Sequence, residues 1–267
     1  MKRLFTFFAA TMSAVLMWTS CTIKEDRGPC PCFLDIYLEN AAEFSKEALL
    51  TGWSAAGDGL YRVNVDVHDY EGSYYETTVP KGFNSSCALL GATLSRVQGN
   101  RVIIPFGRGC DHYYAHCHEN IDCTGEFAED HLQIHKQYAM LYLQTSTEMA
   151  DFLGDLRFVV IGEVNGMTLD TLSPTQGEFR CEAVLNENGN WEICLPRQLD
   201  DTLRLEVYDG SGKLYATYEL GRMIARTNYS WAKLDLDDIY LTIDLNPHVM
   251  LKLSINDWDT KAFTFVI

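Results

Sequence analysis

The chain has 267 residues, of which 47% are hydrophobic and 22% are charged. That apolar fraction is sufficient for well-packed cores, and the length suits two domains of ordinary size. The formal net charge is −16 and no basic stripe interrupts it, which argues against nucleic acid and anionic membrane surfaces as partners.

The N-terminus has the layout of a secretory signal. The dipeptide Lys2-Arg3 precedes an apolar run from Leu4 to Trp18, and two small residues then lead directly into Cys21. The run is shorter than the ~20 residues that a membrane-spanning helix needs. We therefore predict that residues 1–20 are a lipoprotein signal peptide and that Cys21 is the lipid attachment site. The alternative is an ordinary signal peptide cut nearby, which would leave Cys21 as one more thiol.

A basic residue followed by two acids comes shortly after Cys21, at Lys24, Glu25 and Asp26. This pattern resembles the surface-export signal of lipoproteins in Bacteroidetes-type bacteria. Residues 21–32 are accordingly predicted to form a lipidated tether on a protein exposed at the surface of the outer membrane. The alternative interpretation is a short solvated tether, because charged residues are common near chain termini.

The rest of the chain has the period-two alternation of half-buried strands. The predicted strands cover 33–38, 61–67, 74–79, 101–105, 137–143, 157–164, 178–184, 191–195, 203–207, 213–219, 241–245, 250–255 and 262–267. Two short helices are predicted at 41–50 and 221–227. This spacing of strands and turns favours an all-β protein of antiparallel sandwiches. A polar stretch at 146–155 predicts a boundary between an N-terminal β-sandwich domain at 33–150 and a C-terminal one at 151–267.

Eight cysteines remain after Cys21, and an even number in an exported protein favours disulfides. The candidates are Cys30, Cys32, Cys87, Cys110, Cys117, Cys123, Cys181 and Cys194. Eight cysteines allow 105 pairings. One pair is predicted locally, because a hairpin centred on Glu187 and Asn188 would place Cys181 opposite Cys194. A shift of one residue in register would separate them.

Two cysteine-containing segments could serve as a redox pair or a metal site instead of forming structural disulfides. Cys30 and Cys32 could form a redox pair, but the thioredoxin-type motif has two intervening residues, so structural half-cystines are predicted. The Cys- and His-rich segment 110–123 could hold zinc, which takes thiolate and imidazole ligands. It has no Cys-x-x-Cys pair, and an oxidising compartment favours disulfides. We predict no metal, no cofactor and no enzymatic activity, since the common nucleophile, zinc-protease and phosphate-loop signatures are absent.

The order of several motifs resembles a known family. They are the opening residues 21–27, Cys30-Pro31-Cys32, the alternation from Leu34 to Leu38, Leu195-Pro196-Arg197-Gln198, and the segments 229–231, 234–239, 242–244 and 255–258. In this order the chain resembles the FimB-type fimbrial anchor and minor-subunit lipoproteins (fimbrillin-A associated anchor proteins) of Bacteroidetes-type bacteria. The match covers the N-terminus and residues 155–267, whereas residues 80–135 match poorly.

The resemblance implies two transthyretin-like antiparallel β-sandwich domains. It also implies a non-enzymatic protein that anchors or caps a fimbria (pilus) at the outer membrane and joins shaft or accessory subunits by β-strand addition. We further hypothesise that the strand at 262–267 completes the second sandwich while a partner's strand enters the first. Deletion of 262–267 would then unfold the second domain. The alternative function is a surface lipoprotein that binds glycans, which would need exposed aromatic rings on one face. A metal-dependent enzyme is a third possibility, and it depends on segment 110–123.

Overall fold

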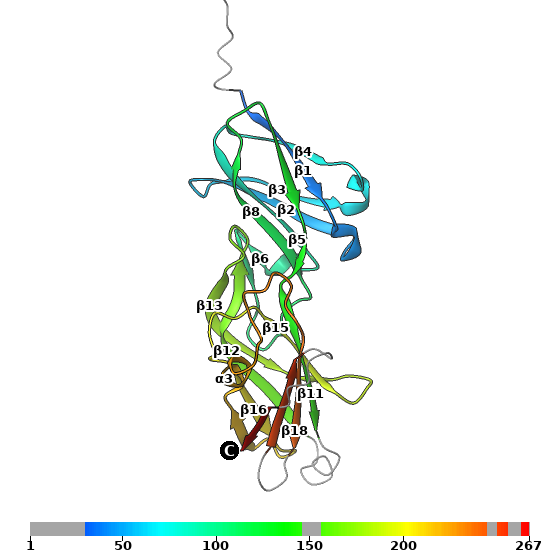
Figure 1. Cartoon of the computed structure of the whole chain (residues 1–267), viewed down its shortest axis with the longest axis vertical. Coiled ribbons are helices and arrows are strands. Elements are labelled where there is room, and N and C mark those ends of the chain that lie inside the picture. The colour runs from blue at the N-terminus through cyan, green and yellow to red at the C-terminus, as the bar shows by residue number, and fades with distance from the viewer. Residues whose placement is uncertain (1–29, 146–155, 245–249, 256–262, 267) are drawn as a thin grey trace, which may run out of the picture.

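The computed structural model describes residues 30–145, 156–244, 250–255 and 263–266 (Figure 1). The predicted signal peptide, the lipid attachment site, the export signal and the predicted boundary at 146–155 lie outside these residues. The described chain is mostly strand, in several largely antiparallel sheets, which confirms the coarse form of the all-β prediction. Within these residues, no helix has the length and apolar content needed to cross a membrane.

The N-terminal half consists of two facing sheets, which we call the outer sheet and the middle sheet. The outer sheet has β1 (Cys32–Leu38) at its centre, between β4 (Tyr75–Val79) and β9 (Phe127–Leu132). The middle sheet has the order β10 (His135–Lys136), β8 (Tyr114–Asp122), β5 (Phe83–Leu90), β2 (Glu47–Ser54) and β3 (Gly59–Asp66). Between the sheets lies an N-terminal cluster that includes Leu34, Ile36, Leu50, Leu90, Leu132 and Ile134.

The C-terminal half is built from two further sheets. The β11 sheet has the order β14 (Val184–Leu185), β15 (Trp191–Pro196), β11 (Tyr138–Thr145), β18 (Ile239–Asp244), β19 (Met250–Ile255) and β20 (Phe263–Val266). The β12 sheet has the order β17 (Leu214–Tyr218), β16 (Arg204–Tyr208), β12 (Arg157–Thr168), β7 (Arg101–Ile103) and β6 (Val97–Gln98), with β13 (Pro174–Glu182) also paired to β12. The C-terminal cluster includes Leu141, Phe158, Phe179, Leu205 and Ile239.

Helices are few in the described residues. The prediction of a helix at 221–227 is confirmed by α3 (Leu220–Ala225). The prediction at 41–50 is wrong, because only η1 (Ala41–Glu43) forms a 3-10 turn and the chain then enters strand β2. Two more 3-10 turns are η2 (Val67–Tyr70) and η3 (Leu94–Arg96).

The chain passes between the halves several times before residue 150. It leaves the middle sheet after β5, adds β6 and β7 to the β12 sheet, and returns to the N-terminal half for β8, β9 and β10. It then enters the β11 sheet with β11, where β15 and β18 are its neighbours. Gly166 permits the close approach of β7 to β12, since a Cβ there would clash with the carbonyl oxygen of Val102. The chain therefore does not divide at a single point into residues of the N-terminal sheets and residues of the C-terminal sheets.

The middle sheet packs on both of its faces. Leu50 and Leu90 point into the N-terminal cluster, whereas Leu49 and Leu89 belong to the C-terminal cluster. Adjacent residues of a strand point to opposite faces, so β2 and β5 are buried along almost their whole length. The apolar core is thus continuous across the middle sheet, and the two halves share this layer.

Among the described residues two strand pairs are parallel, although the sequence favoured antiparallel sheets throughout. β1 runs parallel to β9, and β11 runs parallel to β18. Parallel neighbours cannot be joined by a tight turn and need a long connection. Here the connection from β1 to β9 contains β2, β3, β5 and β8 of the middle sheet, and that from β11 to β18 contains most of the β12 sheet.

Candidate functional site

The predicted pair Cys181 and Cys194 lies on two different sheets. Cys181 is on β13, opposite Val160, and Cys194 is on β15, opposite Met140. The hairpin around residues 186–190 aligns Val184 with Glu192 and Leu185 with Trp191. This register differs by one residue from the register that would align the two cysteines, so the assumed hairpin geometry is wrong.

None of the eight described cysteines is bonded to another in the structure. Cys30 is exposed and Cys117 is half-buried, and the other six are buried. The buried ones are not scattered evenly. Cys32 and Cys123 lie in the N-terminal cluster, whereas Cys87, Cys110, Cys181 and Cys194 lie in the C-terminal cluster.

The Cys- and His-rich segment forms much of strand β8 rather than a loop. His116 Nδ1 lies 2.6 Å from the carbonyl oxygen of Gln133, and burial lowers the pKa of this imidazole. His118 Nδ1 lies 2.7 Å from Oδ1 of the buried Asp130. Within the described ranges, no three His, Cys, Asp or Glu side chains are placed to hold a metal ion. These imidazoles instead interact with neighbouring strands and loops.

The outer sheet presents aromatic rings on the side that faces away from the N-terminal cluster. We call Phe33, Tyr37, Tyr74, Phe127 and His131 the aromatic face. Phe33 stacks on Phe127 with ring centroids 5.5 Å apart, and Tyr37 stacks on His131 at 4.4 Å. Phe127 is 70% exposed and Tyr74 is 42% exposed. Exposed rings beside the carboxylates of Asp35 and Glu129 can stack on sugars and accept hydrogen bonds from hydroxyls.

A polar cleft of about 750 Å³ lies on the C-terminal half, bordered by β12, β13, β16 and α3. Carboxylates from Glu163 and Glu178 and guanidinium groups from Arg204 and Arg222 line it. No aromatic ring lines this cleft. It can hydrogen-bond to a polar ligand but offers no surface on which a sugar ring could stack.

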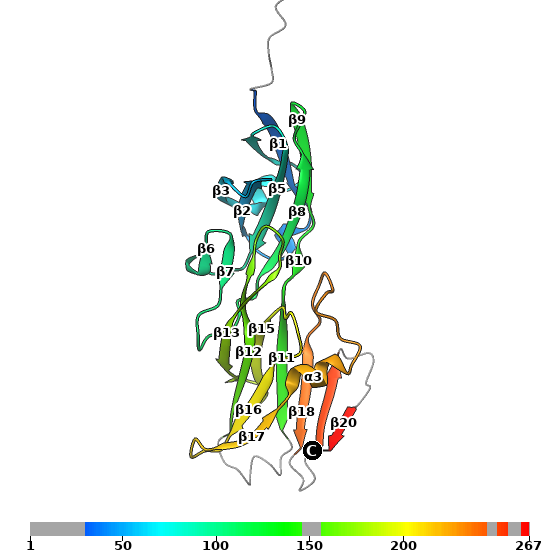
Figure 2. The ribbon, with the colours of Figure 1, turned by 90° about the vertical axis from the view of Figure 1, so that its left-hand side faces the viewer.

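One edge strand, β17, combines accessible backbone with exposed apolar side chains. Among the described residues β17 pairs only with β16, so no described strand lies along its other edge, and Leu214 and Tyr215 are each 46% exposed. Its five residues contain no charge, whereas the edge strand β9 contains Glu129, Asp130 and His131. Charges on an edge strand discourage pairing with another chain, and their absence permits it. Figure 2 places β17 at the end of the molecule opposite β1.

Arg197 belongs to the Leu195–Gln198 motif noted in the sequence. Its hydrogen bonds connect the segment before β18 to the β11 sheet. Its guanidinium donates to Gln137 Oε1 at 2.9 and 3.2 Å and to the carbonyl oxygens of Trp231, Lys233 and Leu234. Burial lowers its pKa. Sequence reasoning marked the position but not these partners, because they lie 34–60 residues away in the chain.

The described residues thus form an elongated β protein with open strand edges and a layer shared between its halves. No family model matches the chain, and no curated protein is similar to it. Solved structures do share its fold. A candidate polysaccharide-binding protein from Bacteroides thetaiotaomicron superposes with a TM-score of 0.62 at 11% identity, covering 89% of this chain and 98% of the other.

Two further solved structures have the same fold. A candidate adhesin from Bacteroides ovatus has a TM-score of 0.59 at 11% identity, over 91% of this chain and 97% of that one. The fimbrial anchor protein Mfa2 from Porphyromonas gingivalis has a TM-score of 0.57 at 10% identity, over 88% of this chain and 100% of Mfa2. The chain therefore shares the fold of a fimbrial anchor and of candidate adhesins, as the family resemblance implied at this coarse level.

Proposed function

We propose that this protein is a non-enzymatic surface lipoprotein that anchors or caps a fimbria at the outer membrane. The observation that carries the proposal is the shared fold with the anchor Mfa2, which extends over 88% of this chain and all of Mfa2. The layout of the N-terminus agrees, because residues 1–20 have the pattern of a signal peptide ending at Cys21. The partners would be shaft or accessory subunits of the fimbria.

The positions of the two ends support this role. The tether at 21–32 leads directly into β1, at one end of the elongated molecule, and β17 lies at the other (Figure 2). A lipid on Cys21 would hold the β1 end at the membrane. A subunit bound at the β17 end would then point away from the membrane, as an anchored fimbria must.

Strand addition is assigned to the edge of β17 rather than to the N-terminal half. β1 already occupies the centre of the outer sheet, paired with β4 on one side and β9 on the other. The described outer sheet therefore leaves no gap between its strands, which counts against the sequence-based hypothesis that a partner's strand enters the first domain. At β17, unpaired backbone groups can bond to an added strand, and Leu214 and Tyr215 can contact its side chains.

The anchor role is tested with Cys21→Ala in cells of the native host, comparing fimbriae on the cells with fimbriae in the medium. Loss of the lipid should shed intact fimbriae into the medium. Cys30→Ala is the matched control, because it removes a nearby exposed thiol that carries no predicted lipid. Fimbriae that stay firmly attached to the Cys21→Ala cells would contradict an anchor.

The strand-addition edge is tested with a double substitution, Leu214→Lys and Tyr215→Lys. Both side chains are exposed, so the fold should be kept while the charges oppose an added strand. Cross-linking in outer membranes should then no longer capture a fimbrial subunit. Leu199→Lys, at a position that is 53% exposed, is the control. Equal capture by wild type and the double variant would exclude β17.

Glycan binding is a second candidate function. It is favoured by the aromatic face and by the fold shared with the candidate polysaccharide-binding protein from Bacteroides thetaiotaomicron. Retention of the protein in native gels that contain polysaccharide would support it. Phe127→Ala should reduce that retention, whereas Phe106→Ala, which removes a 63% exposed ring that is not part of the aromatic face, should not. Equal mobility in gels with and without polysaccharide would remove this candidate.

A further inference from the structure

Cys32 and Cys123 are brought together where the tether enters the fold. Cys32 is the first residue of β1 and lies opposite Val79 of β4. The chain continues from Val79 to Gly82, which exchanges two backbone hydrogen bonds with Cys123, at 2.9 and 3.4 Å. The loop after Cys123 also contacts β1, since the amide of Phe33 donates to the carbonyl oxygen of Glu126 at 2.8 Å.

Both of these thiols point into the N-terminal cluster. Each residue is fully buried, and both belong to the same group of contacting side chains. Burial, followed by the interaction with Cys123 and a hydrogen bond between the two side chains, raises the pKa of the Cys32 thiol to about 11. The two sulfur atoms are therefore neighbours.

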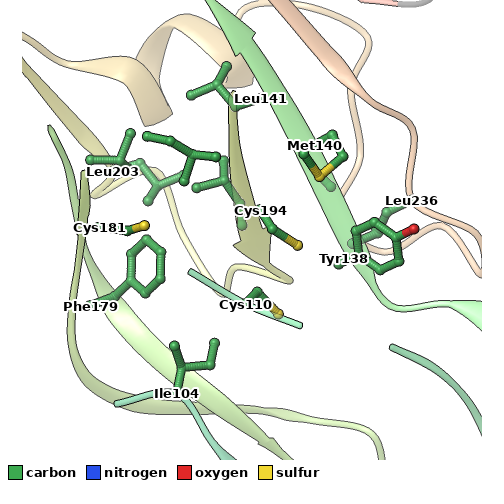
Figure 3. Packing of buried hydrophobic residues seen from close by; sticks show 14 of the residues in the cluster. Ile104, Cys110, Tyr138, Met140, Leu141, Phe179, Cys181, Cys194, Leu203 and Leu236 are labelled. Atoms are coloured by element: carbon green, nitrogen blue, oxygen red, sulfur yellow. The ribbon is translucent and has the colours of Figure 1, made fainter. Parts of the chain in front are cut away.

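Cys110 and Cys194 form a second, independent pair. The amide of Cys110 donates to the carbonyl oxygen of Cys194 at 3.0 Å, and both residues are buried in the C-terminal cluster. Figure 3 shows their sulfur atoms in the same part of the core. Burial, followed by a hydrogen bond with Cys110, holds the pKa of the Cys194 thiol far above its ordinary value.

Cys181 also lies close to Cys110, but Cys194 is the better disulfide partner for Cys110. Its thiol bonds to the carbonyl oxygen of Glu182 at 3.4 Å, and it has no hydrogen bond with Cys110. Figure 3 places Cys181 next to Phe179, away from the sulfur of Cys110. The contacts of Cys110 thus favour Cys194.

We infer that Cys32–Cys123 and Cys110–Cys194 are the sites of two disulfides in the exported protein, and that the first locks β1 against a pull on the tether. For each bond, two thiols lose two protons and two electrons, and a sulfur–sulfur bond forms. A disulfide-bearing oxidant accepts the electrons by exchange and leaves as a dithiol. The inference rests on the proposed function, because export supplies the oxidising compartment.

The first disulfide would change the route that force takes through an anchored protein. Without it, a pull on residues 21–31 acts on β1, which is held by its hydrogen-bonded pairing with β4 and β9. With it, force passes from Cys32 directly to Cys123, and the chain from 33 to 122 is bypassed. β1 could then leave the outer sheet only if the sulfur–sulfur bond broke.

The pairing is tested on the full-length protein, isolated from membranes of the native host with thiols blocked by N-ethylmaleimide at lysis. Cleavage after Lys, Arg and Glu without reduction should give peptide 28–39 linked to 120–126, and 109–119 linked to 193–197. A protease that cuts before Asp111 then separates Cys110 from Cys117. Cys30→Ser should keep the first link and Cys32→Ser should lose it. Alkylated Cys32 and Cys123 in protein that has lost residues 1–20 would overturn the inference.

A second experiment distinguishes a failure of this inference from a failure of the proposed function. The purified protein is unfolded, then refolded in a glutathione redox buffer, where geometry alone selects the pairs. Formation of the two links in vitro, with unprocessed and fully reduced protein in cells, would support the inference and count against export. Other pairings in vitro would overturn the inference, whatever the location of the protein.

Single-molecule pulling tests the mechanical claim. The measurement uses Cys110→Ser protein, which cannot form the second disulfide. Its unfolding from the two ends should release a chain that is shorter in the oxidised than in the reduced state by about 300 Å, the extended span of the 91 peptide units between positions 32 and 123. Adding Cys32→Ser should give the full length in both conditions. Equal lengths for the oxidised and reduced Cys110→Ser protein would contradict the lock.

Discussion

The first and last described strands both alternate in sequence but have very different positions in the fold. β1 alternates Leu34 and Ile36 with outward residues, and β20 has the same kind of alternation. Yet β1 pairs with two strands and its inward side chains are fully buried, whereas β20 pairs only with β19, at the edge of the β11 sheet. Alternation in sequence therefore marks a strand without revealing how much of the fold depends on it.

The largest expected effect comes from breaking β1. Leu34→Asp places a carboxylate in a fully buried position without a partner, on top of the lost apolar contacts. We expect a loss of about 5 kcal/mol or more, which is comparable to the whole stability of many domains. Urea unfolding followed by circular dichroism measures it. Phe33→Asp introduces the same charge on the exposed side of β1 and should cost about 1 kcal/mol. Equal losses of stability in Leu34→Asp and Phe33→Asp would contradict the view that the fold depends on the buried side of β1.

We expect the C-terminal half to depend more on the hydrogen bonds of Arg197 than on its last strand. Arg197→Lys keeps the charge but cannot satisfy Gln137 and the three carbonyl oxygens together, because lysine has a single ammonium group. The expected loss is about 2–3 kcal/mol, measured by urea unfolding. Arg222→Lys, on the exposed side of α3, is the control. A stability unchanged in Arg197→Lys would show that the segment at 231–234 holds its place without these bonds.

Deletion of 262–267 should have a smaller effect than either change. Removal of β20 costs one edge ladder of four paired positions, and we expect about 1–2 kcal/mol with the remaining fold kept. This is milder than the unfolding that we expected from the sequence. Thr264→Pro is the matched variant, because it removes one amide donor while keeping the strand's length. Complete loss of cooperative thermal unfolding in the truncated protein would restore the original expectation.

Several of the strands that the sequence predicted have one covered face. The alternation at 61–67 and 203–207 predicted β3 and β16, because polar residues stay on their open side. β2 and β5 were missed because both of their faces are covered, which removes the alternation. β8 was missed because its His and Cys residues resembled a ligand-binding segment.

Partners along the sheets could not be predicted from local pattern. The pairing of β7 with β12 and of β11 with β18 joins residues far apart in the chain, and the alternation of either strand is compatible with many neighbours. The same limit applies to cysteines. Cys32 and Cys123 are 91 positions apart, and only the folded loop at Gly82 brings them together. Local turn geometry instead pointed to Cys181 and Cys194.

The smallest expected effect concerns the exposed contact between β1 and β9. His131 Nδ1 lies 2.6 Å from Oε1 of Glu39, just after β1, and this hydrogen bond raises the pKa of the imidazole. A raised pKa means that the folded state favours the protonated form. The contribution is therefore complete below the unfolded pKa of about 6.5 and is lost as the pH rises through the folded value.

Solvent limits the size of this contribution, because both side chains are about half exposed. We expect a difference in unfolding free energy well below about 1 kcal/mol between pH 5.5 and pH 8, absent in Glu39→Gln. NMR titration of the His131 ring gives the folded pKa directly. A value at or below that of an unfolded histidine would mean that the Glu39–His131 contact adds nothing to the β1–β9 ladder and to the Phe33–Phe127 and Tyr37–His131 stacks.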